Sequence, residues 1–360
     1  MFSDAFQDAS YHSENVSYRN LLALQEICCK MVMQSRQKQR RRIQDMNMIK
    51  VQNLTKMYGD FCAVDHISFE VKRASTLGFL GINGAGKSTT INMLSTLLTP
   101  DEGSAQLCGY TAGREDHQIR RRIGIVYQQN CLDDLLSVKE NLMTRGILHG
   151  ASKKEAAVQL KRLCDMLNLD DILNKKYRTL SGGQKRRCEI AAALMHTPEI
   201  LFLDEPTTGL DPATRANMWE TLKELQKKEK ITIFLTTHYM EEAAGADNII
   251  ILDHGKIITS GTAFELKEKY AADKLRLYFD ETDSAKTKEI AAAVLEAGMR
   301  KKIVRLKNKG IEMPIHATMD ALPVLEAVRE KIDGFEVIQG NMDDVFLNAV
   351  ERNGEQDGEI

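Results

Sequence analysis

A glycine-rich segment beginning at Gly81 has the residue types of a phosphate-binding loop. Its sequence, Gly81-Ile-Asn-Gly-Ala-Gly-Lys-Ser88, follows an apolar run and precedes a stretch that favours a helix. Glycines allow successive backbone N–H groups to point at one anion, and a helix N-terminus adds positive charge there. We therefore predict that the loop binds a nucleoside triphosphate. The residues expected to contact it are Asn83, Gly84, Ala85, Gly86, Lys87, Ser88 and Thr89.

Two acidic residues end an apolar run later in the chain. The segment Ile200-Leu-Phe-Leu-Asp-Glu205 has the pattern of a strand that is buried on both faces. In open α/β sheets the ligand binds at the carboxyl ends of such strands. Asp204 and the hydroxyl of Ser88 would hold Mg²⁺, while Glu205 would polarise a water for in-line attack on the phosphate. The two patterns together predict nucleotide hydrolysis.

A second candidate anion site lies at residues 180–184. The sequence Leu-Ser-Gly-Gly-Gln places a serine hydroxyl and glycine amides just before a helix-like stretch. One phosphate-binding loop does not account for this second site. We expect Ser181, with Gly182, Gly183 and Gln184, to contact the γ-phosphate of the nucleotide held by another copy of the chain.

The composition is that of an ordinary globular protein of about two domains. The 360 residues include 49 Lys and Arg against 51 Asp and Glu, a formal charge of −2, which argues against a polyanion-binding protein. The longest uninterrupted apolar run, Ile190 to Met195, is too short for a membrane span, and the N-terminus does not have the pattern of a secretory signal. The seven cysteines form no metal-binding pattern, so we expect reduced thiols in a cytosolic protein.

The patterning along the chain changes several times and indicates the domains that position these residues. Short β-branched and aliphatic segments from Ile49 onwards predict a sheet domain over residues 48–270. The period becomes helical between Ser137 and Met195, where Ser137 and Ser152 each begin a capping-box pattern. A helical subdomain, at about residues 130–195, is therefore expected within the sheet domain.

The two ends of the chain differ from this central part. Residues 1–47 are polar and then basic, and we expect a helical or disordered extension. Strand-like and helix-like segments alternate over 271–350 and predict a small α+β domain, followed by a flexible tail at 351–360. The predicted fold class is thus α/β: a P-loop NTPase sheet domain with an inserted helical subdomain, plus a small α+β C-terminal appendage.

Residues 49–265 resemble the ATP-binding subunits of ABC transporters, through the phosphate-binding loop, the acidic strand end and the segment 180–184. The resemblance implies ATP as the nucleotide. It also implies that Tyr58 stacks on adenine and that Gln128 contacts the metal or the attacking water. Asp211 would lie in a loop that spans the dimer, and His238 would sense the γ-phosphate.

The C-terminal segment 271–350, which ends in Met342-Asp-Asp-Val-Phe-Leu347, resembles the extension found in the daunorubicin-resistance branch of these subunits. That resemblance implies ATP-driven export of a drug, an antibiotic or a lipid. Because no span is expected in this chain, the integral-membrane permease would be a separate polypeptide. The chain would form a homodimer around two ATP molecules and sit at the cytoplasmic face of the cell membrane through the permease.

The alternative is a soluble ABC-type ATPase that acts in translation or DNA repair. Translation factors of that type usually carry two cassettes in one chain, and repair ATPases contain long coiled coils. This sequence has one phosphate-binding loop and no long heptad run, so nucleic acid is a minority hypothesis that rests on the basic stretch within residues 1–47. A P-loop kinase or GTPase would not account for residues 180–184.

Overall fold

The computed structural model describes residues 47–279, 284–296, 304–306, 310–315 and 318–357. The basic extension expected at residues 1–47 therefore lies outside the described residues, apart from Asn47. Among the described residues, no helix is long and apolar enough to cross a membrane.

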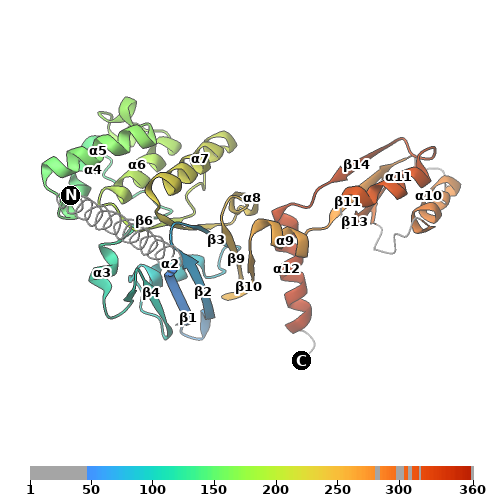
Figure 1. Ribbon diagram of the computed structural model, residues 1–360, viewed down its shortest axis with the longest axis horizontal. Coiled ribbons are helices and arrows are strands. Elements are labelled where there is room, and N and C mark those ends of the chain that lie inside the picture. The colour runs from blue at the N-terminus through green and yellow to red at the C-terminus, as the bar shows by residue number, and fades with distance from the viewer. Residues whose placement is uncertain (1–46, 280–283, 297–303, 307–309, 316–317, 358–360) are drawn as a thin grey trace, which may run out of the picture. The chain divides into compact units, whose positions relative to one another are not determined.

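A largely parallel sheet forms the centre of the nucleotide-binding part (Figure 1). Its strand order is β10-β9-β3-β8-β7-β6, with β10 antiparallel at one edge and the other pairs parallel. Every residue of β7 and β8 is buried, as expected for apolar strands that are covered on both faces. The strands are β3 (Thr76–Leu80), β6 (Ile123–Val126), β7 (Ile200–Asp204), β8 (Thr232–Thr237), β9 (Asn248–Asp253) and β10 (Lys256–Gly261).

A second, antiparallel sheet packs on helix α2 and the central sheet. Its order is β2-β1-β4-β5. Phe69 of β2 lies against Phe79 and Phe234 of the central sheet, with ring centroids 5.6 and 6.1 Å away. These rings join one apolar core that also contains residues of α2. The elements are β1 (Asn47–Tyr58), β2 (Phe61–Lys72), α2 (Lys87–Leu94), β4 (Glu102–Leu107), β5 (Tyr110–Thr111) and α3 (Asp116–Arg120).

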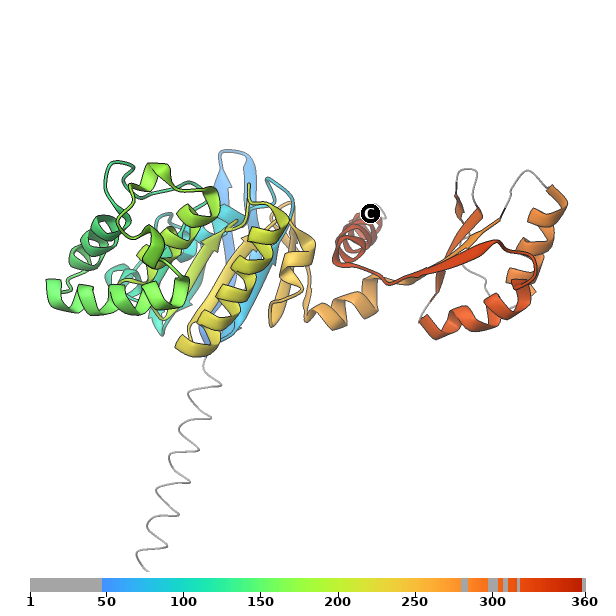
Figure 2. The same cartoon turned by 90° about the horizontal axis from the view of Figure 1, so that it is seen from above.

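A group of helices covers the other side of strands β6 to β8 (Figures 1 and 2). Ser137 and Ser152 each form the capping box that the sequence predicts, with Glu140 and Glu155 respectively. We propose that α4, α5 and α6 make up the helical subdomain expected at about residues 130–195. The helices are α4 (Val138–Leu148), α5 (Lys153–Leu167), α6 (Gly182–Leu194) and α7 (Pro212–Glu229).

The C-terminal part has its own four-stranded sheet, of order β12-β13-β11-β14, and a separate apolar core with α10 and α11. Strand β13 was not predicted, because Gly310 and Pro314 within it weaken the strand pattern. Among the described residues, β12 pairs with Gly310 to Glu312, and Pro314 pairs with Lys274 of β11. The elements are β11 (Asp273–Tyr278), α10 (Ser284–Glu296), β12 (Val304–Leu306), β13 (Gly310–Ile315), α11 (Ala321–Val328) and β14 (Gly334–Ile338).

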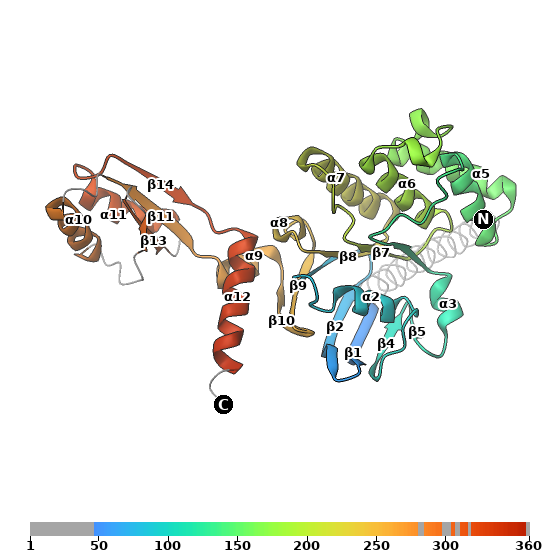
Figure 3. The same ribbon diagram turned by 180° about the vertical axis from the view of Figure 1, so that it is seen from behind.

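The last helix, α12 (Met342–Asp357), packs on α8 (Met240–Ala243) and α9 (Ala263–Tyr270) (Figure 3). Its buried residues Met342, Val345 and Phe346 share a core with Leu80 and Met240. The helix continues through residues 351–357, where the sequence predicted a flexible tail. Arg352 helps to hold this part, since its guanidinium donates to the carbonyl of Lys269, 3.3 Å away.

Candidate active site

The phosphate-binding loop joins β3 to α2, which is the strand–loop–helix setting that the sequence predicts. Gly84 and Gly86 have φ angles of 86° and 101°, in the region that favours glycine. Gly81 is needed for a different reason than the predicted backbone freedom. A Cβ atom there would lie 2.6 Å from the carbonyl oxygen of Leu252, so close packing requires glycine.

Lys87, the first residue of α2, is buried, with 5% of its surface exposed. Its Nζ donates to the carbonyl oxygens of Gly81 and Ile82 at 2.7 and 3.0 Å. The same atom lies 3.6 Å from Oε1 of Glu205. Burial lowers the pKa of Lys87, and the charges of Glu205 and Asp204 oppose that effect. The ammonium group is thus placed at the loop, where phosphate oxygens could replace the carbonyl oxygens of Gly81 and Ile82 as its partners.

Ser88 and Asp204 lie side by side at the loop. The Ser88 hydroxyl donates to Oδ1 of Asp204 at 3.3 Å, and the Thr236 hydroxyl donates to the same oxygen at 2.6 Å. A hydroxyl and a carboxylate oxygen are ligands that suit Mg²⁺. No group of three or more His, Cys, Asp or Glu residues in the described ranges could hold a metal ion.

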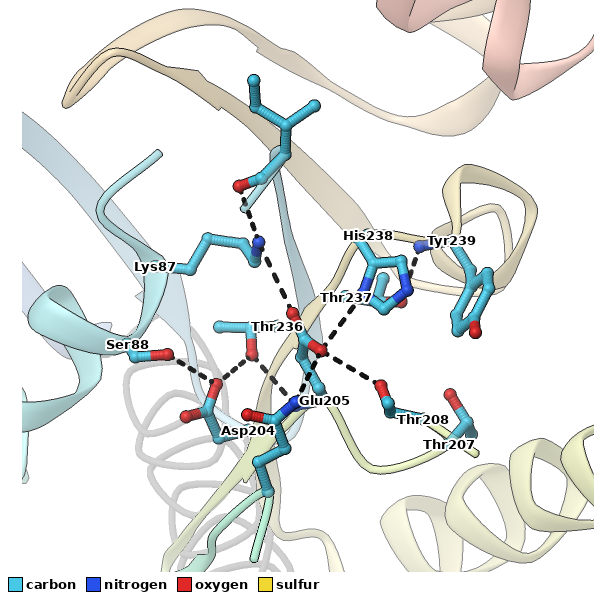
Figure 4. Close-up of polar contacts among 12 residues, drawn as sticks. Lys87, Ser88, Asp204, Glu205, Thr207, Thr208, Thr236, Thr237, His238 and Tyr239 are labelled. Atoms are coloured by element: carbon cyan, nitrogen blue, oxygen red, sulfur yellow. Dashed lines mark hydrogen bonds and ion pairs between the residues drawn. The ribbon is translucent and has the colours of Figure 1, made fainter. Parts of the chain in front are cut away.

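Glu205 is the centre of the hydrogen-bond network drawn in Figure 4. Its Oε2 accepts from Gln128 Nε2 at 3.3 Å and from the Thr208 hydroxyl at 3.0 Å, and it lies 3.1 Å from Nδ1 of His238. Glu205 has a positive φ of 46°, and its N–H donates to Thr236 Oγ1 at 3.1 Å. Gln128, Glu205 and His238 follow β6, β7 and β8, which are neighbours in the sheet.

The surroundings of Glu205 keep its carboxylate ionised. Burial raises the pKa of Glu205, but hydrogen bonds from His238 and Thr208, together with the charges of His238 and Lys87, lower it more. The resulting pKa lies below the usual value of a glutamate, so the group is a charged proton acceptor at neutral pH. Such a group can orient and polarise a water molecule.

Ser181 forms the N-cap of α6 within its own chain. Its Oγ accepts from Gln184 N at 3.4 Å, and Gln184 Oε1 accepts from Ser181 N at 3.0 Å. A Cβ at Gly183 would lie 2.5 Å from the side chain of Thr214, so glycine lets α6 and α7 approach. Among the described residues, no hydrogen bond or ion pair joins Ser181 to Lys87 or Glu205.

The remaining residues expected at the nucleotide have the following positions. Tyr58, at the end of β1, is 51% exposed, as a ring available for stacking would be. Asp211 caps α7, accepting from the backbone N–H and hydroxyl of Thr214 at 3.0 and 2.6 Å. Among the loop residues, Ala85 is buried and Asn83 is exposed.

Sequence reasoning missed a buried carboxylate beside this network. Glu242 is 8% exposed and accepts from the Thr207 hydroxyl at 2.7 Å and the Thr237 hydroxyl at 2.9 Å. Arg215 Nε lies 3.4 Å away from it. Glu242 thus ties the segment after Glu205 to the residue before His238. In the sequence, the pair of threonines that ends the apolar strand β8 could have indicated a buried polar partner nearby.

Comparisons with known proteins agree with this geometry. The family described as ABC transporter matches residues 64–208. The chain is 38% identical, over 84% of its length and 92% of the relative, to the daunorubicin/doxorubicin resistance ATP-binding protein DrrA of Streptomyces peucetius. It is 35% identical to the Nod factor export ATP-binding protein I of Ralstonia nicotianae, over 85% of this chain and 94% of that protein.

The solved structures show the same fold. A dimeric ATP-binding cassette in a post-hydrolysis state, bound to ADP and Pi, aligns with a TM-score of 0.53 and 31% identity, covering 60% of this chain and 98% of the other. The cbiO1 protein of Clostridium perfringens, part of an ABC transporter complex, aligns with a TM-score of 0.58 and 27% identity, covering 70% and 97%. The predicted α/β fold class is thereby confirmed. From the loop, the acidic strand end and these relatives, we conclude that the chain belongs to the ABC transporter family, as an ATP-hydrolysing ATP-binding subunit.

Proposed function

We propose that this chain drives the export of a drug, an antibiotic or a lipid through a separate membrane permease. Two relatives whose names refer to resistance or export match it over 307 and 314 residues. Those matches are longer than the expected sheet domain at residues 48–270, so they include sequence outside the ATPase. The proposal of export is therefore supported by similarity outside the ATP-binding domain as well as within it.

The geometry around Glu205 is the observation that supports the proposed chemistry best. Glu205 orients and polarises the attacking water, while Gln128 and His238 hold its carboxylate and contact the water and the γ-phosphate. Lys87 neutralises the phosphates, and Tyr58 stacks on the adenine. A bound Mg²⁺, held by Ser88, Gln128 and Asp204, would neutralise charge on the phosphate oxygens. The remaining loop contacts are Asn83, Gly84, Ala85, Gly86 and Thr89.

We further propose that two copies of the chain complete each other's sites. Ser181, Gly182, Gly183 and Gln184 of one copy contact the γ-phosphate bound by the other, and Asp211 lies at the same interface. The dimeric form of a solved relative supports this arrangement. ATP then favours the closed dimer because only that state contacts the γ-phosphate from both sides.

A mixing experiment tests this shared site. We expect Ser181→Arg and Glu205→Gln proteins each to be nearly inactive alone, because each damages both sites of its own homodimer. In an equal mixture, half of the dimers are mixed and each has one intact site, so about one quarter of the wild-type ATPase rate should return. The measurement is phosphate release after mixing the two proteins.

The control is a mixture of Lys87→Ala with Glu205→Gln. Lys87 and Glu205 belong to the same copy in each site, so both sites of every mixed dimer are damaged. No activity should therefore return. Full activity of Ser181→Arg alone, or equal recovery in the control mixture, would contradict shared sites.

The proposed permease and membrane location are tested by purification from native cells. An affinity-tagged chain should be recovered from the membrane fraction with an integral membrane protein in comparable amount. Washing at high salt should leave this complex intact if the contact is specific rather than electrostatic. Recovery with ribosomes or DNA instead would favour the alternative, an ATPase that acts in translation or DNA repair.

A further inference from the structure

Helix α6 carries two buried charged side chains one turn apart. Arg186 is 5% exposed and Glu189 is 6% exposed. The helix begins next to Ser181, so both residues lie within nine positions of the proposed γ-phosphate contact. Charged groups that are buried in this way need partners, because their desolvation is costly. In both cases the partners include backbone groups close in sequence to the proposed catalytic residues.

Arg186 holds the backbone on both sides of Glu205. Its Nε donates to the carbonyl of Pro206 at 2.7 Å, and its Nη2 donates to the carbonyl of Asp204 at 3.0 Å. Its Nη1 donates to the carbonyl of Tyr127, the residue before Gln128. One guanidinium thus joins the segment around Glu205 to the segment that carries Gln128. A planar group with several N–H donors can bond to several carbonyls at once.

Glu189 holds the other end of the segment that carries Gln128. Its Oε1 accepts from the N–H groups of Cys131 and Leu132 at 2.8 and 3.1 Å. The same oxygen accepts from the buried hydroxyl of Tyr177 at 2.7 Å. From a single turn of α6, Arg186 therefore bonds to the start of residues 127–132 and Glu189 bonds to their end.

We propose that Arg186 and Glu189 are positioning residues for ATP hydrolysis. They fix Gln128 relative to Glu205, and they make both move with α6. Glu205 has a φ of 46°, a conformation that a non-glycine residue keeps only when its surroundings hold it. The bonds from Arg186 to the carbonyls on either side of Glu205 supply that restraint.

The same contacts give α6 a role in coupling the two sites of a dimer. Ser181 caps this helix and is proposed to bind the nucleotide held by the partner copy, whereas Arg186 and Glu189 hold the catalytic residues of their own copy. A small shift of α6 on nucleotide engagement would then move Gln128 and Glu205 together relative to the phosphate-binding loop. This inference rests on the roles proposed above for Ser181, Gln128 and Glu205.

The first test is Arg186→Gln. We expect kcat to fall about 100-fold, because loss of the guanidinium releases both turns and displaces the water-orienting groups. ATP affinity should stay within about twofold, since Arg186 does not contact the phosphate-binding loop. The matched control is Arg187→Gln, which also removes bonds to two carbonyls, those of Leu167 and Asn168, but away from Glu205. The control should keep kcat even if its melting temperature falls.

The second test separates positioning from folding and also serves if Arg186→Gln does not fold. Glu189→Ala removes the acceptor for Cys131 and Leu132, whereas Glu189→Gln keeps an oxygen there. We expect a loss of kcat in the alanine variant and its restoration in the glutamine variant. A folded Arg186→Gln with wild-type kcat would overturn the proposal, as would equal kcat values in the two Glu189 variants.

The Glu205→Gln protein distinguishes this inference from the proposed catalytic site. If Glu205→Gln still turns over ATP rapidly, the site itself is misassigned. If it is inactive while Arg186→Gln keeps the wild-type kcat, the catalytic site stands and only the positioning role of Arg186 fails.

Discussion

Replacing Glu205 by glutamine should lower kcat by about 10³-fold and leave ATP binding intact. The substitution keeps the shape of the side chain and an oxygen that can accept from Gln128 and Thr208. It removes the negative charge that polarises the attacking water. Since Glu205 does not belong to the phosphate-binding loop, the nucleotide contacts of Lys87 remain.

The measurement combines phosphate release with gel filtration. Dimers of Glu205→Gln should accumulate in the presence of Mg·ATP, because the closed state forms but is not released by hydrolysis. Glu199→Gln is a matched control at the opposite end of β7, where the carboxylate pairs with Arg73 and Arg122 at the surface. It should retain the wild-type rate. Rapid turnover by Glu205→Gln would refute the role proposed for this carboxylate.

Replacing Lys87 by alanine should weaken ATP binding itself by about 10- to 100-fold. The ammonium group is buried and close to the backbone of the loop, so it can exchange its bonds to Gly81 and Ile82 for phosphate oxygens. Hydrogen bonds between charged groups in such a site are stronger than neutral ones. The expected loss reflects the missing phosphate contact.

Equilibrium binding of a fluorescent ATP analogue measures this effect directly. Lys50→Ala is the control, because Lys50 lies on β1 with 43% of its side chain exposed and forms an ion pair with Glu70, 3.5 Å away. Its affinity for the analogue should equal that of the wild type. Unchanged affinity in Lys87→Ala would show that the loop does not bind the nucleotide as proposed. The two variants thus separate binding, which requires Lys87, from turnover, which requires Glu205.

Features that depend on neighbours in the sequence could be predicted well. The capping boxes at Ser137 and Ser152 join residues three positions apart, so the sequence contains the whole interaction. The phosphate-binding loop is similar, because Gly84 and Gly86 act on their own backbone between β3 and α2. The apolar strand that ends at Asp204 was also evident from its pattern.

Features that depend on distant contacts were missed. Arg186 and Glu242 look like solvated charges in the sequence, and only their buried contacts with carbonyls and hydroxyls show what they hold. Strand β13 contains Pro314, whose partner Lys274 of β11 is distant in the chain. In the helical continuation of α12 past residue 351, Arg352 donates to the carbonyl of Lys269 of α9, which is distant in the chain.

The sequence alone was enough to predict the chemistry proposed for this protein, since residue types and short spacings indicate a phosphate-binding loop, an acid for a metal ion and a proton acceptor. The tertiary structure decided which of these groups meet. Gln128, Glu205 and His238 are far apart in the chain, and they come together because β6, β7 and β8 pair side by side and end at the same edge. Strand order depends on long-range hydrogen bonding and core packing, and no local pattern encodes it.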